Sequence, residues 1–359
     1  MNRIIMSILV VLNFQMCVQA QENVLQEKPT IDKRVELLSI VFRLAERPEY
    51  SSNELKLYSD RIDQYFEKHK NHELIQFTKS IVNENEISYD GAMWMATHLD
   101  DNLRLLTDIK EMWQQDPRWT KENVEKFVPL LQKFYKDTRF DEFFKDNNDI
   151  YDEAVKRFGP IGEQMDLNWY SSFFGKESAN IYSIKIGLGI WGNCFGTNVD
   201  YTNGNRTVYA IMGVWMVDET SLPVFSKMPN LPILVHEFCH PFVDNLTAKS
   251  NELFRESGEK IFSVANSGAY TSWEVVLDEA LLNASVTMYM KDHNFEQSEI
   301  EYWIRLIKNG FGCFWIEDLV NELEKYDKQR DKYPTFESYM PKLAEAYKIW
   351  AEKMPSNTQ

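Results

Sequence analysis

The sequence predicts an α+β protein in which helices come first, a small and mostly antiparallel sheet follows, and helices then return. Apolar residues recur with helical spacing from Ile31 to about Phe158. Residues 180–217 are instead rich in β-branched and aromatic side chains, which favour strands. Beyond Asn230 the helical spacing resumes. Because helices and strands fall in separate blocks, we expect an α+β arrangement.

The first residues have the features of a secretory signal peptide. Arg3 supplies positive charge, Ile4–Leu12 is apolar, and Val18-Gln19-Ala20 fits a cleavage site, so we expect residues 1–20 to be removed. The apolar run is too short to span a bilayer as a helix. Lipid attachment at Cys17 is an alternative, although the residues before it are a poor match to those that precede a lipidated cysteine. We expect a secreted or periplasmic protein without stable membrane insertion.

Residues 21–160 are expected to form a helical amino-terminal lobe, and residues 161–359 a second domain. The segment "VELLSIVFRLA" at 35–45 has helical apolar spacing. The motif "FGPIG" at 158–162 is a plausible boundary because glycine and proline interrupt helices.

Charge and cysteine content narrow the classes of function. A net charge of -16 disfavours nucleic-acid binding, because the phosphate backbone would be repelled. An odd number of cysteines remains after signal cleavage, namely Cys194, Cys239 and Cys313, so a fully paired disulfide framework is excluded. A bond between Cys194 and Cys313 stays open. The sequence does not indicate an oligomeric state.

Within the second domain the elements follow in a clear order. We expect strands within 180–193, 194–199 and 206–217, with "YTNGN" at 201–205 as a turn. Helices are expected at about 230–245, 250–262, 272–291, 296–308, 314–327 and 335–352.

The helix near residue 236 carries the strongest chemical signal, in "LPILVHEFCHPFVDNL". His236 and His240 are one helical turn apart, so both imidazoles can bind one Zn²⁺ ion. Glu237 lies about 100° around the helix, beside the metal, and can accept a proton from a zinc-bound water. Asn230 and Pro232 suit the start of this helix.

Proline follows the second histidine directly. Pro241 would clash with the carbonyl of Glu237 in a straight helix, so we expect the helix to kink or tighten there. Cys239, between the histidines, is expected to face the core.

A third zinc ligand is expected from the helix "SWEVVLDEALLNASVTMYM" at 272–290. Glu279 has apolar neighbours on its own face, as a carboxylate pointing inward would, and small residues beside it allow another helix to approach. Glu274 is the alternative, with Asp278 as the carboxylate that orients a zinc-bound histidine. Glu274 and Glu279 are about 140° apart around a helix, so they cannot both face the metal.

The motif resembles that of the zincin metallopeptidases. The form with a third histidine is excluded, because Val243 and Leu246 stand where glycine and histidine would be needed. The gluzincin arrangement, in which a glutamate is the third ligand, remains. The chain is more closely similar to a secreted bacterial family known as a domain of unknown function, through "CFG", "YAIMG", "VHEFCHPFV" and "YDKQRDKYPTFESYMPKL". In that family a glutamate is followed four residues on by a polar residue and then alanine, which matches Glu279 and implies that it is the ligand.

These features predict a secreted zinc peptidase that hydrolyses peptides or proteins. A non-catalytic binding or surface protein on the same scaffold is the alternative, and an intact Glu237 argues against it. A cysteine peptidase using Cys194 is a weaker alternative, because no particular histidine is paired with it. His98 is expected to be a core residue and not a ligand.

Two further expectations concern the substrate. Tyr326, Arg330 and Tyr333 are candidate donors to the oxyanion that develops during hydrolysis. The strand "YAIMGVW" at 209–215, just before the metal helix, is a candidate for binding a peptide by strand addition.

Overall fold

The computed structural model describes residues 24–354 except 26, 86, 88, 176–179, 244–245 and 266–271. The expected signal peptide, with Cys17, lies outside the described residues. No helix in the described ranges is both long and apolar enough to cross a lipid bilayer.

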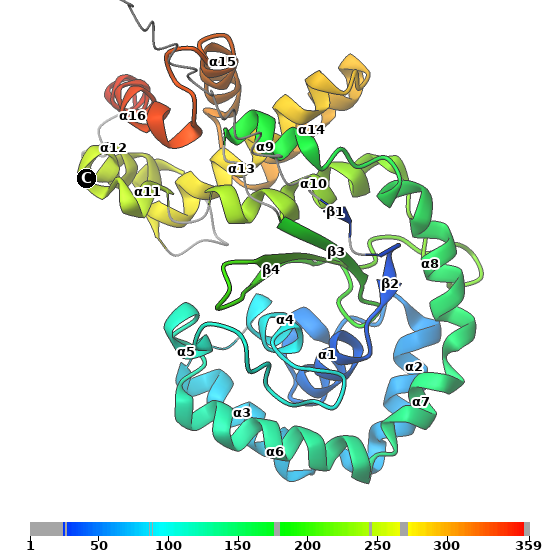
Figure 1. Cartoon of the computed structure of the whole chain (residues 1–359). Helices are drawn as coiled ribbons and strands as arrows, with labels where there is room; N and C mark the ends of the chain where they lie inside the picture. The colour runs from blue at the N-terminus through cyan, green and yellow to red at the C-terminus, as the bar shows by residue number, and fades with distance from the viewer. Residues whose placement is uncertain are drawn as a thin grey trace, which may run out of the picture.

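The protein is α+β, as predicted, with one mixed sheet between two layers of helices (Figure 1). The strands are β1 (Val24–Leu25), β2 (Thr30–Ile31), β3 (Asn180–Ile186), β4 (Cys194–Asp200) and β5 (Arg206–Met212). The strand order is β1-β3-β5-β4, and β2 also pairs with β3. The first two strands come from the amino-terminal segment, so both parts of the chain build the sheet.

The expectation of a mostly antiparallel sheet is wrong. Strands β1, β2 and β5 all run parallel to β3, and only β4 and β5 are antiparallel. The turn at 201–205 forms the predicted β4–β5 hairpin, in which the Tyr201 amide donates to the Asn205 carbonyl over 2.9 Å. After β3, however, the chain first forms β4, which lies at the edge of the sheet. It then turns back through the hairpin and forms β5 between β3 and β4, so β5 is parallel to β3.

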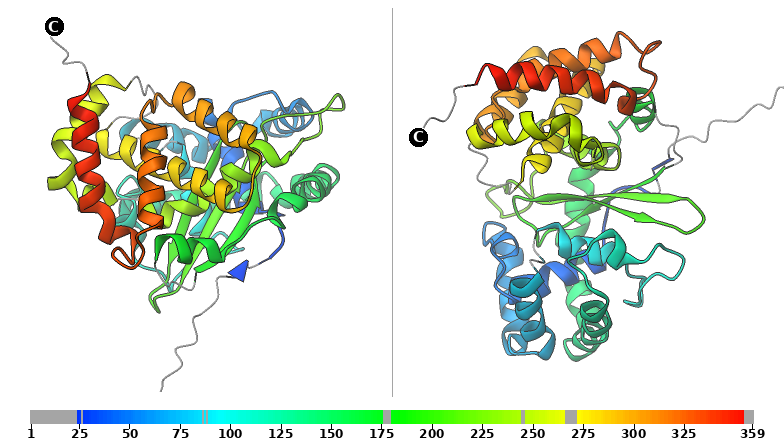
Figure 2. Two further views of the ribbon diagram at one scale, coloured as in Figure 1. Left: turned by 90° about the horizontal axis from the view of Figure 1, so that it is seen from above. Right: turned by 90° about the vertical axis from the view of Figure 1, so that its left-hand side faces the viewer.

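The amino-terminal helices lie mainly on one side of the sheet. They are α1 (Lys33–Leu44), α2 (Lys56–Phe66), α3 (Glu73–Asn85), α4 (Asp90–Thr97), α5 (Met112–Gln115), α6 (Lys121–Asp137), α7 (Phe140–Asp146) and α8 (Asn148–Gly162), with short 3-10 turns at Pro48–Tyr50 and Glu67–His69. Helices α1 and α4 lie next to the sheet (Figure 2). The "FGPIG" motif forms the last turn of α8, so it ends a helix.

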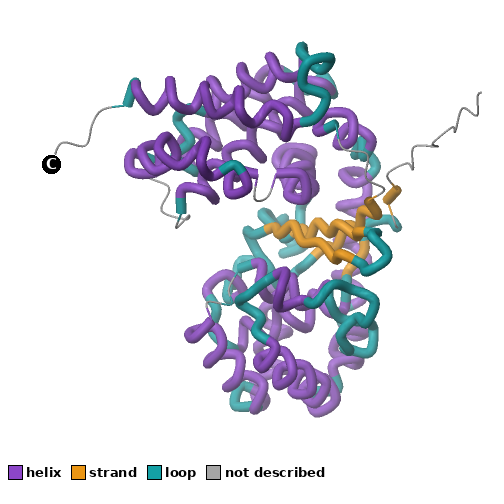
Figure 3. Tube along the Cα trace, turned by 60° about the vertical axis from the view of Figure 1, so that its left-hand side comes forward, coloured by secondary structure: helices purple, strands orange, loops and turns teal. Residues whose placement is uncertain are grey.

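The remaining helices cover the opposite face (Figure 3). They are α9 (Asn168–Phe174), α10 (Lys227–Val243), α11 (Leu246–Lys249), α12 (Asn251–Val264), α13 (Trp273–Asp292), α14 (Gln297–Gly310), α15 (Ile316–Asp327) and α16 (Phe336–Glu352). Six of these match the predicted helices to within a few residues.

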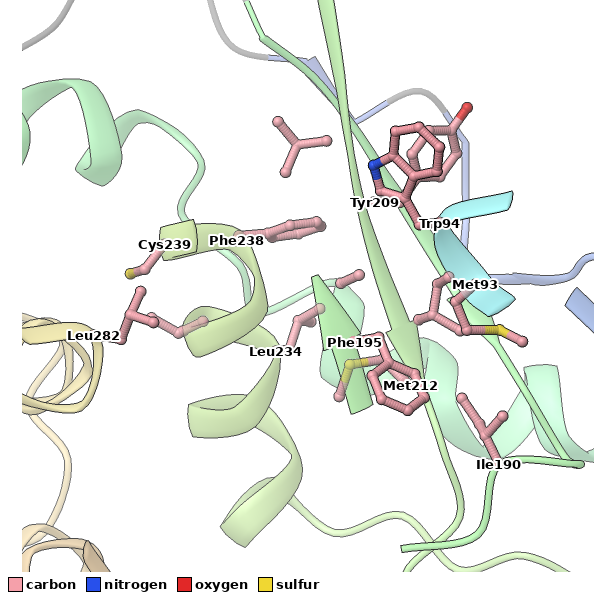
Figure 4. Packing of buried hydrophobic residues seen from close by; sticks show 14 of the residues in the cluster. Met93, Trp94, Ile190, Phe195, Tyr209, Met212, Leu234, Phe238, Cys239 and Leu282 are labelled. Carbon is pink, nitrogen blue, oxygen red and sulfur yellow. The ribbon is translucent and has the colours of Figure 1, made fainter. Parts of the chain in front are cut away.

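The core extends through both faces of the sheet. Phe238 and Leu234 of α10 point toward one face, and Met93 and Trp94 of α4 lie on the other (Figure 4). Cys239 lies between α10 and α13 and is fully buried, as predicted. One continuous cluster of buried apolar residues includes all of these layers.

Helix α10 continues through Pro241 to Val243, and its only non-helical residue is Met228. The backbone angles therefore stay helical at Pro241, and the helix continues for two residues beyond it. Proline has no N–H to bond the carbonyl of Glu237, and that carbonyl faces strand β4. Asn230 does not cap the helix. It lies inside α10 and donates to the carbonyl of Ser226 over 2.9 Å.

Candidate metal centre

Three potential metal ligands converge where α10 crosses α13. One ligand atom each of His236, His240 and Glu279 lies within 4.8 Å of the others, and Nε2 of His236 is 3.6 Å from Oε2 of Glu279. Helices α10 and α13 pack against each other, and Ala280 and Ala284 of α13 are small, buried residues. The three side chains are 15–21% exposed, so they are sheltered and still within reach of a small ion.

The distances suit a tetrahedral ion. Metal–ligand distances of about 2.0–2.1 Å place neighbouring ligand atoms about 3.3 Å apart. The pair His236–Glu279 is close to this value at 3.6 Å. The two imidazoles lie edge to face, with ring centroids 5.2 Å apart, so that they approach a shared point from different directions. A shift of about 1 Å or less would bring all three donors into position.

His236 is held in the protonation state that a metal ligand needs. Burial and, to a lesser degree, the neighbouring His240 together lower the pKa of its imidazole to about 3. A hydrogen bond to the Asn283 side chain acts in the opposite direction. The ring is therefore neutral at neutral pH, with a nitrogen lone pair available.

Asn283 positions two members of the group. Its side-chain amide donates to the backbone carbonyl of Glu279 over 2.8 Å, and its side chain hydrogen-bonds His236. Such partners fix the orientation of a metal-binding imidazole. The sequence assigned no role to Asn283. The available signal was a polar residue one turn after Glu279, among buried positions of α13 that are mostly apolar.

Glu237 lies beside the three potential ligands. Its side chain is 7% exposed, and its Oε2 is 3.7 Å from Nε2 of His240. A buried carboxylate next to the metal position, outside the group of possible ligands, has the placement of a general base.

Strand β4 closes one side of the site through Gly196. A Cβ atom at this glycine would lie 2.6 Å from Cδ2 of His240 and 2.6 Å from the carbonyl oxygen of Glu237. It would also lie 3.2 Å from Oε2 of Glu237. Only glycine lets the strand approach the helix this closely.

Asp278, the orienting carboxylate of the alternative assignment, is bonded to α11. Asp278 accepts from the Thr247 amide over 3.3 Å and from its hydroxyl over 3.0 Å, which holds the start of α11 against α13. The same hydroxyl lies 3.3 Å from the backbone carbonyl of Glu274. Within the described residues, Glu279 joins the two histidines and Glu274 does not.

Tyr326 and Arg330 have a structural role in this fold. The buried Tyr326 hydroxyl donates to the carbonyl of Phe173 over 2.8 Å, and Arg330 donates to the same carbonyl and to the Tyr326 hydroxyl. Arg330 also donates to the carbonyl of Pro334 over 2.9 Å. These bonds connect the end of α15 to α9. Tyr333 packs edge-on against Tyr339 of α16. These contacts of the three candidate oxyanion donors are with α9, with α16 and with the segment between α15 and α16.

The cysteines do not form a nucleophilic site. Within the described residues Cys194, Cys239 and Cys313 form no disulfide, so the open pairing of Cys194 with Cys313 is not formed. Burial, followed by the charge of Glu237, raises the pKa of the Cys194 thiol to about 12. A thiol with this pKa stays protonated and is a poor nucleophile.

His98 is fully buried, as predicted, and stacks on Trp94 with ring centroids 3.7 Å apart. Its Nδ1 lies 2.8 Å from the Trp94 carbonyl, and burial lowers the pKa of the imidazole to about 4. It belongs to the core beside α4.

The strand available for peptide addition is β4. The predicted strand lies in β5, which is paired on both sides by β3 and β4, so it offers no free edge. Strand β4 is the outermost strand of the described sheet on that side, and it is the strand next to Glu237 and His240.

Comparison with known families gives one match. The family described as a domain of unknown function, DUF4932, matches residues 29–346. No curated protein and no solved structure matches the chain.

Proposed function

The chain belongs to the DUF4932 family, whose function is unknown, and we propose from the geometry of its site that it is a secreted zinc-dependent peptidase. The observation that carries this proposal is the convergence of His236, His240 and Glu279 beside Glu237. Two imidazoles and one carboxylate are the ligands of gluzincin-like catalytic zinc sites, which leave one coordination position for water or substrate.

The residues of this chain fit a Zn²⁺ ion in number, chemistry and spacing. A bound ion would lower the pKa of a coordinated water to about 7 and polarise the substrate carbonyl. Neutral His236, oriented by Asn283, supports binding of a metal and opposes binding of a proton.

Glu237 is the proposed general base and acid. It accepts a proton from the attacking water as the water oxygen bonds to the carbonyl carbon of the substrate. It then delivers a proton to the leaving nitrogen as the C–N bond breaks, so the products are a carboxylic acid and an amine. Its position 3.7 Å from His240 supports this role.

The proposed substrate is an extended peptide that pairs with the outer edge of β4. Peptides that add to a sheet edge gain main-chain hydrogen bonds without regard to sequence. Because Gly196 of β4 lies against Glu237 and His240, a peptide on this edge would pass directly in front of the proposed metal position.

Metal analysis tests the proposal. We expect about one zinc ion per chain in protein purified without a histidine tag and dialysed after zinc loading. The double variant His236→Ala/His240→Ala is expected to retain none under the same treatment. A wild-type chain that stays metal-free would refute the proposed zinc peptidase. A chain that binds zinc and cleaves no peptide would be a binding protein on this scaffold.

A further inference from the structure

The outer edge of β4 is partly occupied by the protein's own chain. Ile109 forms an antiparallel bridge with Tyr201, directly after the end of β4. The amide of Lys110 donates to the carbonyl of Asp200 over 3.0 Å. Residues 108–110 therefore lie along the outer edge at the carboxyl end of β4, as a short additional strand would.

The rest of this edge includes Gly196, which lies against Glu237 and His240. In an antiparallel pair, alternate residues direct their backbone groups to the partner strand. Tyr201 bonds Asn205 across the hairpin, so the odd-numbered residues of β4 face β5. The backbone groups of Cys194, Gly196 and Asn198 consequently point outward. No strand of the described chain pairs with them there.

A substrate peptide antiparallel to β4 would follow the same line as residues 108–110. It would run in the same direction, so its N-terminus would face the end of this segment. Glu111 follows Lys110 and begins helix α5, which turns the chain away from the edge. The substrate would thus meet the protein's own backbone at its N-terminal side.

The length of the free edge limits the substrate. Lys110 is bonded to Asp200, four residues along β4 from Gly196, and Glu111 extends one residue further toward the site. Antiparallel partners advance residue by residue, so about three substrate residues fit beyond Glu111, the last of them opposite Gly196. This stretch measures about 10 Å.

We propose that the enzyme removes short segments from the N-terminus of peptides, cutting within about three residues of a free α-amino group. This inference rests on the proposed function.

The test uses the full mature chain loaded with zinc and a series of peptides that share one sequence. The N-terminus is extended by one residue at a time, and each product is identified by mass spectrometry. We expect every first cut within about three residues of the N-terminus, whatever the extension. A head-to-tail cyclic form of the peptide should resist cleavage.

A pair of variants tests the role of the segment itself. Lys110→Pro removes the amide that donates to the Asp200 carbonyl and should weaken the pairing of residues 108–110 with β4. We then expect the fraction of cuts farther from the N-terminus to rise several-fold. Lys110→Ala keeps this amide and should retain the wild-type cut positions. Zinc content and thermal unfolding show whether either variant is misfolded. The peptide series on the wild-type chain is decisive even if Lys110→Pro fails to fold.

The outcomes separate this inference from the proposed function. Cuts at a fixed internal bond, or cuts counted from the C-terminus, would overturn the inference and leave a peptidase. The absence of any cleavage that depends on Glu237, in these peptides and in an unfolded protein, would overturn both.

Discussion

Glu237 and the three proposed ligands have separable roles because their side chains differ in chemistry and position. Glu237 lies beside the group, so a change in its proton affinity should affect the reaction and spare metal binding. The ligands should behave in the opposite way, because each supplies an electron pair to the ion.

Glu237→Gln should retain the fold and the zinc content while hydrolysis falls by at least about 100-fold, the usual contribution of a general base. The amide has the size of the carboxylate and cannot accept the proton of the attacking water. Elemental analysis and peptide cleavage on the same sample check this expectation. Near-normal cleavage by the variant would show that another group is the base.

Residues that only orient a ligand typically change metal affinity by roughly 10- to 100-fold. Glu279→Ala should weaken zinc binding by more than this. Competition with a chelator measures this affinity. Glu274→Ala is the matched control on the same helix and should bind zinc as the wild type does, because Glu274 is outside the histidine group. The assignment is wrong if only the control variant loses the metal.

At the scale of elements, the sequence predicted what depends on local spacing. The helix expected at 272–291 is α13 at Trp273–Asp292, and the pair His236 and His240 lies on one helix as expected. Contacts between distant segments were not predictable in this way. The parallel pairing of β3 with β5 arises because β4 takes the edge position in the sheet. The hydrogen bond from Tyr326 to the Phe173 carbonyl joins α15 to α9.

The close contact of β4 with α10 explains why a glycine is needed at position 196. In Gly196→Ala the new methyl group would overlap the His240 ring and the Glu237 carbonyl, which are both 2.6 Å from its position. Overpacking of this kind costs about 1–3 kcal/mol of stability. We also expect zinc affinity to fall by at least about 10-fold, because His240 is displaced.

Gly159→Ala provides the control, since a methyl group there meets no atom within 4 Å and the residue lies within helix α8. It should be neutral or slightly stabilising. Chemical denaturation and chelator competition on both variants compare the two sites. Equal behaviour of the two alanine variants would contradict the tight contact.

At the scale of the whole molecule, a buried carboxyl group connects the amino-terminal helices to the sheet. Glu36 of α1 is fully buried and accepts the Leu188 amide over 2.7 Å, in the loop between β3 and β4. It also accepts the Tyr58 hydroxyl of α2 over 2.5 Å, and that hydroxyl lies 2.7 Å from the hydroxyl of Tyr151 on α8. Three helices and the loop before the edge strand therefore meet at this one group.

Burial raises the pKa of Glu36 to about 7 from its usual value of 4.5, against the lowering effect of its hydrogen bonds to Tyr58, Leu188 and Gly189. The folded protein consequently holds a proton that the unfolded chain releases. Stability should fall as the pH rises from about 4.5 to about 7, by up to about 3 kcal/mol in total, and should not change further above that range on account of this group.

Glu36→Gln should remove this dependence, because an amide does not ionise; its oxygen can still accept the Leu188 amide, and its NH2 can donate to the Tyr58 hydroxyl oxygen. Urea unfolding of both proteins between pH 4.5 and pH 8, with a chelator present so that metal binding does not contribute, measures the difference in their free energies of unfolding. That difference should shift in favour of the variant as the pH rises, since the other titrating groups are shared and cancel. A difference that stays constant across this range would mean that Glu36 ionises equally easily in the folded and unfolded chains. The buried group would then contribute only its hydrogen bonds to the connection between helices and sheet.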